Sequence, residues 1–355
     1  MKSYPALLRN LWAPAVGLLL STLVVVGLLL SIGESPRVLW EAFRSTLFTG
    51  FGLGYTLYYT TPLIFTGLSV AVAFHCGLFN IGAEGQLYFG ALGIALASHF
   101  FPMSSHAAVV LGVAAALLLG GIWGALPGLL KAARGTHEVI ATLLLNFIAL
   151  SIVDWAILYP LKNPEVQNPE TRDIALGYVL PTLDGILSRW GIPFFASTPV
   201  NPSLFLAILL AIGLSWFLKR TTLGFELRAA GENPRAARFM GVSVGRVSVI
   251  SFGLSGALAG LVGVNEVMGN QHKLMEGFSP QYGFTGIAVA LLARNHPIGI
   301  LASALLFGAL HNGSRELEFL SEKVTKELSL VIQAILIASV AGEALWRSFS
   351  RSKGT

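Results

Sequence analysis

The feature that most constrains this chain is a succession of apolar runs, most of them roughly 20 residues long and separated by short polar stretches. Hydrophobic residues make up 54% of its 355 residues and charged residues only 12%, and the mean hydropathy is +0.71. A soluble domain carries about 25% charged residues, because its apolar surface must fit inside one core. The chain is therefore predicted to be an all-α, polytopic membrane protein in which residues 1–355 form a single transmembrane domain.

At the length of a membrane span, the sequence predicts about ten transmembrane helices. We expect them at residues 12–32, 57–76, 85–101, 107–130, 139–158, 203–218, 247–267, 282–293, 298–311 and 328–345. The runs at 282–293 and 298–311 are short for a span and are separated by Arg294, Asn295, His296 and Pro297. One or both are predicted to be broken or re-entrant, which is typical of helices that line a cavity.

The lysines and arginines indicate the direction in which the helices cross. If every helix crosses, the larger groups of basic residues fall on one side: Lys2, Arg9, Lys131, Arg134, those of the loop at 219–246, Arg294, Arg347, Arg351 and Lys353. That side is predicted to be the cytoplasm, with both termini there. The other side receives segment 159–202 and an acidic stretch with Glu316, Glu318 and Glu322. The net charge of +5 is therefore attributed to helix orientation and not to nucleic-acid binding.

Polar side chains gather in the run GLFNIGAEGQ, which begins at Gly77 and carries Asn80, Glu84 and Gln86. An ionised residue at the centre of a spanning helix costs about 2.5 to 3.5 kcal/mol, so such residues usually face a cavity, a partner or a substrate. The run predicts part of a transport pathway. The alternative is that Asn80 and Glu84 cap or tie the ends of broken helices.

Four more polar residues lie at membrane depth and are predicted to line the same path: Asn146, Asn265, Glu266 and Thr285. Amide and carboxylate groups can bind the hydroxyls of a ribose, and a ring such as Phe79 or Phe284 can stack on a base.

The loop at 219–246 is predicted to hold a short helix of about two turns. Asn233 suits the N-cap, Pro234 the first helical position and Gly241 the C-terminal stop. Its arginines and its Phe239 and Met240 suit a helix that inserts into a groove on another protein. They equally suit an interfacial helix whose arginines contact anionic lipid headgroups.

The sequence offers little support for catalysis or for a resident cofactor. It lacks a GxxxxGK[ST] phosphate loop, so the energy for transport must come from elsewhere. Its histidines lack a zinc-binding spacing, and its one cysteine, Cys76, is predicted to be a small packing residue. Two sources of energy stay open: an ATPase partner, or an ion gradient acting through Glu84, Asp154 and Glu266.

Three motifs in order along the chain resemble the permease subunits of bacterial ABC importers, in the branch assigned to nucleosides and often described as simple-sugar permeases. They are GLFNIGAEGQ, GENPRAARFMGV from Gly231, and EGFSPQYGFTGIAVALLARNHPIGILASALLFGAL from Glu276. The resemblance implies a multi-pass subunit of the bacterial cytoplasmic (inner) membrane. Its partners would be a second permease subunit, often non-identical, two cytoplasmic ATPase subunits that bind ATP and Mg, and an extracytoplasmic binding lipoprotein.

The resemblance also implies that the short helix is the coupling helix, which docks on the ATPase. The residues assigned to coupling on this basis are Arg228, Gly231, Asn233, Pro234, Ala236, Ala237, Arg238, Phe239 and Gly241. The chain departs from the branch at Thr285, where an aspartate is common, and at Ala293, where a glycine is common. Simple sugars such as ribose and branched-chain amino acids therefore stay open as alternative substrates to nucleosides.

Overall fold

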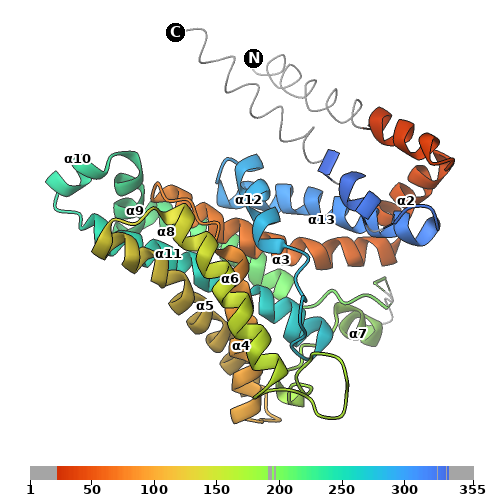
Figure 1. Ribbon diagram of the computed structural model, residues 1–355, viewed down its shortest axis with the longest axis horizontal. Helices are drawn as coiled ribbons and strands as arrows, with labels where there is room; N and C mark the ends of the chain where they lie inside the picture. Colours follow the sequence, from red (N-terminus) through yellow and green to blue (C-terminus); the bar gives the residue numbers. More distant parts are fainter. Residues whose placement is uncertain (1–21, 191–193, 196, 326, 333, 336–355) are drawn as a thin grey trace, which may run out of the picture. The chain divides into compact units, whose positions relative to one another are not determined.

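The computed structural model describes residues 22–190, 194–195, 197–325, 327–332 and 334–335 (Figure 1). These residues form helices joined by turns and loops, with two isolated β-bridges and no strand among them. The chain divides into two compact units, one of residues 60–305 and the other of residues 1–59 and 306–355. The prediction of an all-helical fold is confirmed for the part that the structure describes.

The larger unit holds most of the helices, and α3 and α13 belong in part to each unit. In chain order the elements are α2 (Arg37–Phe48), α3 (Gly50–His75), α4 (Ala83–Phe100), α5 (Ala107–Arg134), α6 (Glu138–Leu158), η1 (Leu176–Tyr178), α7 (Leu183–Leu187), η2 (Ser188–Trp190), α8 (Ser203–Arg220), α9 (Thr222–Glu232), α10 (Pro234–Phe239), α11 (Val244–Gly260), η3 (Val264–Gln271), α12 (Tyr282–Leu292) and α13 (Pro297–Leu320).

Five helical stretches in the described residues are long and apolar enough to cross a membrane. They are Gly50–His75, Ala107–Arg134, Glu138–Leu158, Ser203–Arg220 and Val244–Gln271, each at a predicted span. Helices α4 and α12 also lie where spans were predicted, and α12, with 11 residues, is too short to cross alone. The predicted spans at 12–32 and 328–345 lie partly outside the described residues, although Thr22–Ser31 is a short apolar helix, so the total of ten spans stays a prediction.

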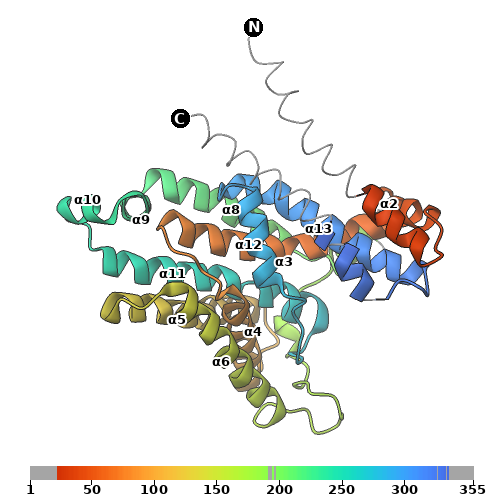
Figure 2. The same cartoon turned by 45° about the horizontal axis from the view of Figure 1, so that its top comes forward.

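Small residues allow close helix packing in the larger unit between α5 and α11. Gly120 and Gly124 are four residues apart and so share one face of α5. A Cβ atom added to Gly124 would lie 2.5 Å from the Phe252 carbonyl oxygen and 2.7 Å from the Cα atom of Gly256. The two backbones therefore touch where side chains are missing, which is the usual solution for helices in lipid. Figure 2 shows α5 and α11 side by side.

The predicted helix at 298–311 is too short, because α13 continues to Leu320. Its last turns contain Glu316 and Glu318, which belong to the acidic stretch predicted on the side opposite the cytoplasm. Within the smaller unit, Glu316 accepts a hydrogen bond from Ser45 at 2.9 Å. Asn312 donates to the Gly52 carbonyl oxygen at 2.9 Å. These partners on neighbouring helical segments allow polar residues to continue a helix where the apolar pattern ends.

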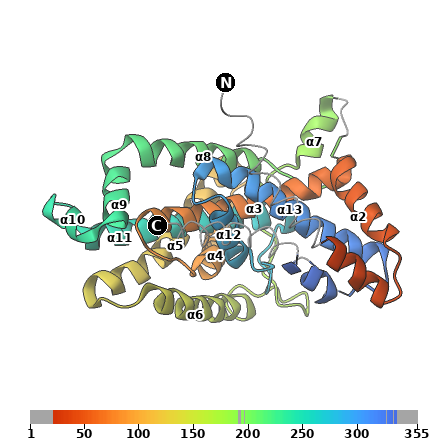
Figure 3. The ribbon, with the colours of Figure 1, turned by 90° about the horizontal axis from the view of Figure 1, so that it is seen from above.

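The loop at 219–246 contains two helices where one was predicted. Lys219 and Arg220 still belong to α8, and α9 follows after a capping residue, Thr221. Figure 3 shows α9 leaving the end of α8 at a steep angle, and α10 projecting beyond the ends of α8 and α11. The predicted short helix is α10, with six residues.

Candidate functional site

The run from Gly77 begins with a buried hydrogen-bond network around Asn80. The Asn80 amide nitrogen donates to Gln86 Oε1 at 2.8 Å and to Ser255 Oγ at 2.7 Å, and Asn80 Oδ1 accepts from Gly82 N. Ser255 in turn donates to the Ser69 carbonyl oxygen. Asn80 is fully buried and Gln86 is 1% exposed. The network therefore joins α3, α4 and α11 at the point where the chain turns between α3 and α4.

Asn146 on α6 caps the buried start of α4. The residue at the start of α4, Gly82, has no side chain to cap with. Instead Asn146 Oδ1 accepts from Gly85 N at 2.8 Å, and its amide nitrogen donates to the Ile81 carbonyl oxygen at 2.9 Å. A helix end buried away from water needs such partners for its first N–H groups.

Glu84 performs the same task for α12. The N-cap position of α12, Gln281, provides no side-chain cap. Glu84 Oε2 accepts from Gly283 N at 2.7 Å, so a buried carboxylate lies at the positive end of the α12 dipole. A Cβ added to Gly283 would lie 2.6 Å from the Cα atom of Glu84, which requires glycine at this junction.

Asn265 and Glu266 lie in η3, whose hydrogen-bonding pattern is that of a π-helix. Asn265 Oδ1 accepts from Asn201 and from Ser203, both at 3.1 Å, and its amide nitrogen donates to Glu266 at 3.0 Å. Both predicted path residues are 1% exposed. The structure thus groups them with the start of α8, and no hydrogen bond in the described residues joins Asn265 to Asn80.

The side chains of the other residues predicted for the path or for ion coupling are less buried in the protein. Thr285 is half-buried within α12, and the neighbouring ring of Phe284 is 38% exposed. Phe79 is half-buried and packs edge-on against Phe74, with ring centroids 5.2 Å apart. Asp154 is half-buried on α6.

Helix α10 has the capping that its sequence predicted. Asn233 Oδ1 accepts from the backbone nitrogens of Arg235 and Ala236, both at 3.1 Å, and Pro234 opens the helix. Gly241 follows with a φ of +86°, a left-handed value that favours glycine. Ala237 is fully buried, whereas Phe239 is 93% exposed. The helix is therefore held on one side and presents an aromatic ring to its surroundings on the other.

The last turn of α9 rests on the loop that carries Asn80. A Cβ added to Gly231 would lie 2.8 Å from the Gly77 nitrogen, so the two backbones touch. Gly77 has a φ of +69° and immediately precedes the segment that leads to Asn80. The predicted coupling residues thus fall into two groups: those of α10, and Arg228 and Gly231 on the helix that supports it.

The segment after α6 contacts the segment before α12 through two pairs of residues, Thr171 with Leu274 and Glu170 with Lys273. We call these four residues the clasp. Thr171 N donates to the Leu274 carbonyl oxygen at 2.9 Å, and Lys273 Nζ contacts Glu170 Oε1 at 2.8 Å. The hydrogen bond to Glu170 raises the pKa of the Lys273 ammonium above its ordinary value. The Lys273 ammonium therefore stays charged at neutral pH, and its charge is lost as the pH rises through the raised pKa.

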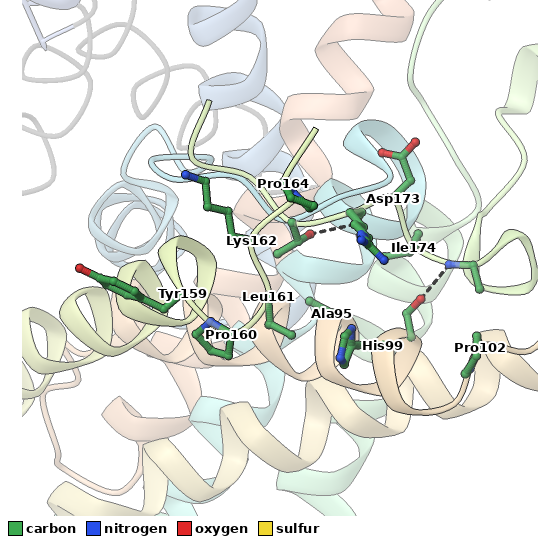
Figure 4. Close-up of a pocket in the computed structure, with 14 residues that line it drawn as sticks. Ala95, His99, Pro102, Tyr159, Pro160, Leu161, Lys162, Pro164, Asp173 and Ile174 are labelled. Carbon is green, nitrogen blue, oxygen red and sulfur yellow. Dashed lines mark hydrogen bonds between the residues drawn. The ribbon is translucent and has the colours of Figure 1, made fainter. Parts of the chain in front are cut away.

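A cavity of about 640 Å³ lies beside this clasp (Figure 4). His99 and Pro102 come from the end of α4, and Tyr159 and Pro160 from the end of α6. Two further lining residues are joined by a hydrogen bond, in which the Ala175 nitrogen donates to Ser98 Oγ at 2.7 Å. The exposed charged side chains on its wall are Lys162, Arg172 and Asp173.

Several residues of these networks were not predicted from the sequence. Ser255 on α11 accepts a hydrogen bond from Asn80 and donates one to the Ser69 carbonyl oxygen. Glu170 and Lys273, the ion pair of the clasp, do not belong to any motif that the sequence analysis found. An isolated serine in an apolar run is a weak signal of a buried network, and Ser69 and Ser255 both have it.

Comparison with known proteins gives one family and several relatives. Residues 52–341 match the family described as branched-chain amino acid transport system, permease component. The guanosine ABC transporter permease protein of Bacillus subtilis is 32% identical over 96% of this chain and 94% of its own length. The nucleoside ABC transporter permease protein of Lactococcus lactis is 32% identical over 94% of this chain and 91% of its own length. The glucose ABC transporter permease protein of Haloferax volcanii is 34% identical over 83% of this chain and 77% of its own length.

Proposed function

Since this chain belongs to the family of branched-chain amino acid transport system permease components, we propose that it is the membrane subunit of an ATP-driven importer for nucleosides. Nucleosides are favoured because the relatives named for guanosine and for nucleosides match nearly the whole chain. A simple sugar is the second candidate, on the strength of the relative named for glucose.

The observation that carries this proposal is the contact between α9 and the loop of Asn80. Phe239 projects from a capped helix and suits a groove on an ATPase. Movement of that helix passes to α9, whose Gly231 touches Gly77. Gly77 leads directly to the Asn80 network. A displacement at the ATPase is thus connected, through packed backbone, to a buried polar junction of three helices.

In the proposed cycle a binding lipoprotein docks on the extracytoplasmic loops, and the cavity beside the clasp lies in that surface. Two cytoplasmic ATPase subunits bind ATP and Mg, and their closure moves α10. A second, non-identical permease subunit completes the pathway. The chain itself holds no cofactor, lies in the bacterial inner membrane and has both termini in the cytoplasm, as the positive-inside rule predicts.

The proposed path residues are Asn80, Glu84, Gln86, Asn146, Asn265, Glu266 and Thr285. Asn80, Glu84 and Asn146 already bind other groups of the protein. A substrate hydroxyl would have to exchange with one of these hydrogen bonds, which costs little when partners of similar strength are replaced. The path therefore opens by rearrangement of the junction between α3, α4 and α11.

Uptake of radiolabelled guanosine, ribose and leucine tests this proposal in cells with and without the gene. We expect guanosine uptake to be lost in the deletion and restored by the gene. Collapse of the proton gradient at constant ATP should leave uptake unchanged. Uptake that stops with the gradient would instead identify an ion-driven carrier working through Glu84, Asp154 or Glu266. Loss of ribose or leucine uptake alone would reassign the substrate.

A further inference from the structure

The proposed transport cycle does not account for a basic cavity at the end of α8. Its volume is about 510 Å³, and it lies where α8 ends and α9 begins. Lys219 and Arg220 line it from the last turn of α8, and Arg228 lines it from α9. Among the lining residues the one carboxylate is that of Glu226. The cavity therefore carries an excess of positive charge.

These cations lack the acidic partners that such groups usually have. Lys219, Arg220 and Arg228 form no ion pair in the described residues. The Arg228 Nε group is buried and has no hydrogen-bond partner there. A buried donor left unpaired is unfavourable, and like charges around one cavity repel each other. Both observations favour an anionic ligand.

The cavity lies at the level where a spanning helix meets the membrane surface. Helix α8 is one of the five stretches able to cross, and Lys219 and Arg220 are its last residues. Trp216 on α8 is 63% exposed and Phe225 on α9 is 52% exposed. Exposed aromatic rings near the end of a span are typical of the headgroup region of a bilayer. The cavity is lined by residues on both sides of the steep turn from α8 to α9 that Figure 3 shows.

We propose that this cavity binds the phosphate headgroup of an anionic phospholipid. Basic pockets between membrane helices are suited to such headgroups. Because Met240 and Gly241, next to the coupling helix, line the same cavity, a bound headgroup would also brace α9 against α10. Anionic lipid would then strengthen coupling. Binding itself does not depend on the proposed function, and only the coupling readout rests on it.

The test uses the purified full-length permease in phosphatidylcholine nanodiscs with spin-labelled phosphatidylglycerol. We expect the wild-type chain to bind the labelled lipid in preference to phosphatidylcholine. The double variant Lys219→Gln/Arg220→Gln should bind it roughly 25-fold more weakly, at about fivefold for each cation near the surface. Arg246→Gln is the matched control, since Arg246 is an exposed cation on α11 outside this cavity. The double variant Lys219→Arg/Arg220→Lys should keep the preference.

Three outcomes would overturn the proposal. An equal loss in Arg246→Gln would indicate diffuse attraction to the membrane. Displacement of the labelled lipid by millimolar inorganic phosphate would indicate a site for free phosphate. If Lys219→Gln/Arg220→Gln instead failed to retain the ATPase in nanodiscs of phosphatidylcholine alone, the cavity would belong to the ATPase docking surface.

Phosphatidylglycerol should also stimulate the ATPase of the reconstituted importer in the wild type and not in the double variant. A normal lipid preference without any ATPase partner would leave this site standing and refute the proposed function alone.

Discussion

At the scale of single residues, a buried amide and a buried carboxylate supply the caps that the N-cap residues of α4 and α12 do not provide. Asn146 caps α4 and Glu84 caps α12, each from another helix. The sequence predicted that polar groups at membrane depth need partners, and it offered capping as an alternative to substrate contact. It gave no means to identify the partners, because Asn146 and Gly85 are 61 residues apart and meet only in the folded chain.

Replacement of Asn146 with alanine should destabilise the permease without changing its topology. The Gly85 nitrogen and the Ile81 carbonyl oxygen would both lose their partner, at a cost of about 1 to 2 kcal/mol. The measurement is thermal unfolding in detergent. Ser151→Ala is the control, because Ser151 is exposed on the same helix and bonds only to its own turn. Equal unfolding temperatures for Asn146→Ala and the wild type would refute the capping role.

Glu84→Gln separates capping from ion coupling. Glutamine keeps a carbonyl oxygen that can accept from Gly283 and loses only the charge at the α12 terminus, which contributes about 0.3 to 1 kcal/mol. We therefore expect nearly normal guanosine uptake with Glu84→Gln and reduced uptake with Glu84→Ala. If Glu84→Gln abolished uptake in cells with normal amounts of permease in the membrane, the carboxylate itself would be required.

At the scale of elements, the capping preferences of adjacent residues predicted α10. They could not predict the extent of helices that depend on contacts between distant parts of the chain. Asn233, Pro234 and Gly241 act through adjacent backbone, so their roles in α10 could be predicted from the sequence. The extent of α13 could not, because Asn312 and Glu316 remain helical through partners from the distant segment at 45–56. The π-helical turns of η3 likewise had no signal in the apolar pattern.

The glycine contact between α5 and α11 predicts a contrast between two substitutions of the same kind. In Gly124→Ala the new methyl group would meet the Phe252 carbonyl oxygen at 2.5 Å, so we expect a loss of about 1 to 3 kcal/mol. In Gly213→Ala on α8 nothing lies within 4 Å, and the better helix former should be neutral or stabilise by about 0.5 to 1 kcal/mol. Thermal unfolding of both variants checks this. Similar unfolding temperatures for the two variants would contradict the close packing.

The exposed ring of Phe239 predicts a specific loss of coupling. In Phe239→Asp the backbone and caps of α10 are untouched, so the permease should keep its unfolding temperature. The amount of ATPase that this variant retains in a pull-down should fall at least tenfold. The reason is that an aromatic ring buried at an interface contributes about 2 kcal/mol or more to binding. Leu176→Asp is the control, because Leu176 is 85% exposed in the segment predicted to face the outside. If both variants retained ATPase equally, α10 would not be the docking element.

At the scale of the whole molecule, one helix decides whether two loops lie on the same side of the membrane or on opposite sides. The segment around Leu176 and the loop around Arg235 are separated by a single long apolar helix, α8. A helix of 18 residues spans about 27 Å, close to the thickness of the hydrocarbon core. If α8 crosses, Leu176 and Arg235 must lie on opposite sides, whatever the total number of spans.

This arrangement predicts the reaction of introduced cysteines with a membrane-impermeant maleimide. The one native cysteine, Cys76, is buried at 5% exposure and should not react. In intact cells Leu176→Cys should be labelled, and Arg235→Cys should be labelled only after the membrane is permeabilised, because basic loops stay in the cytoplasm. Labelling of Arg235→Cys alone would reverse the orientation and place α10 out of reach of a cytoplasmic ATPase. Labelling of both in intact cells would show that α8 does not cross the membrane. The proposed coupling mechanism would then be wrong, because α10 would not lie in the cytoplasm.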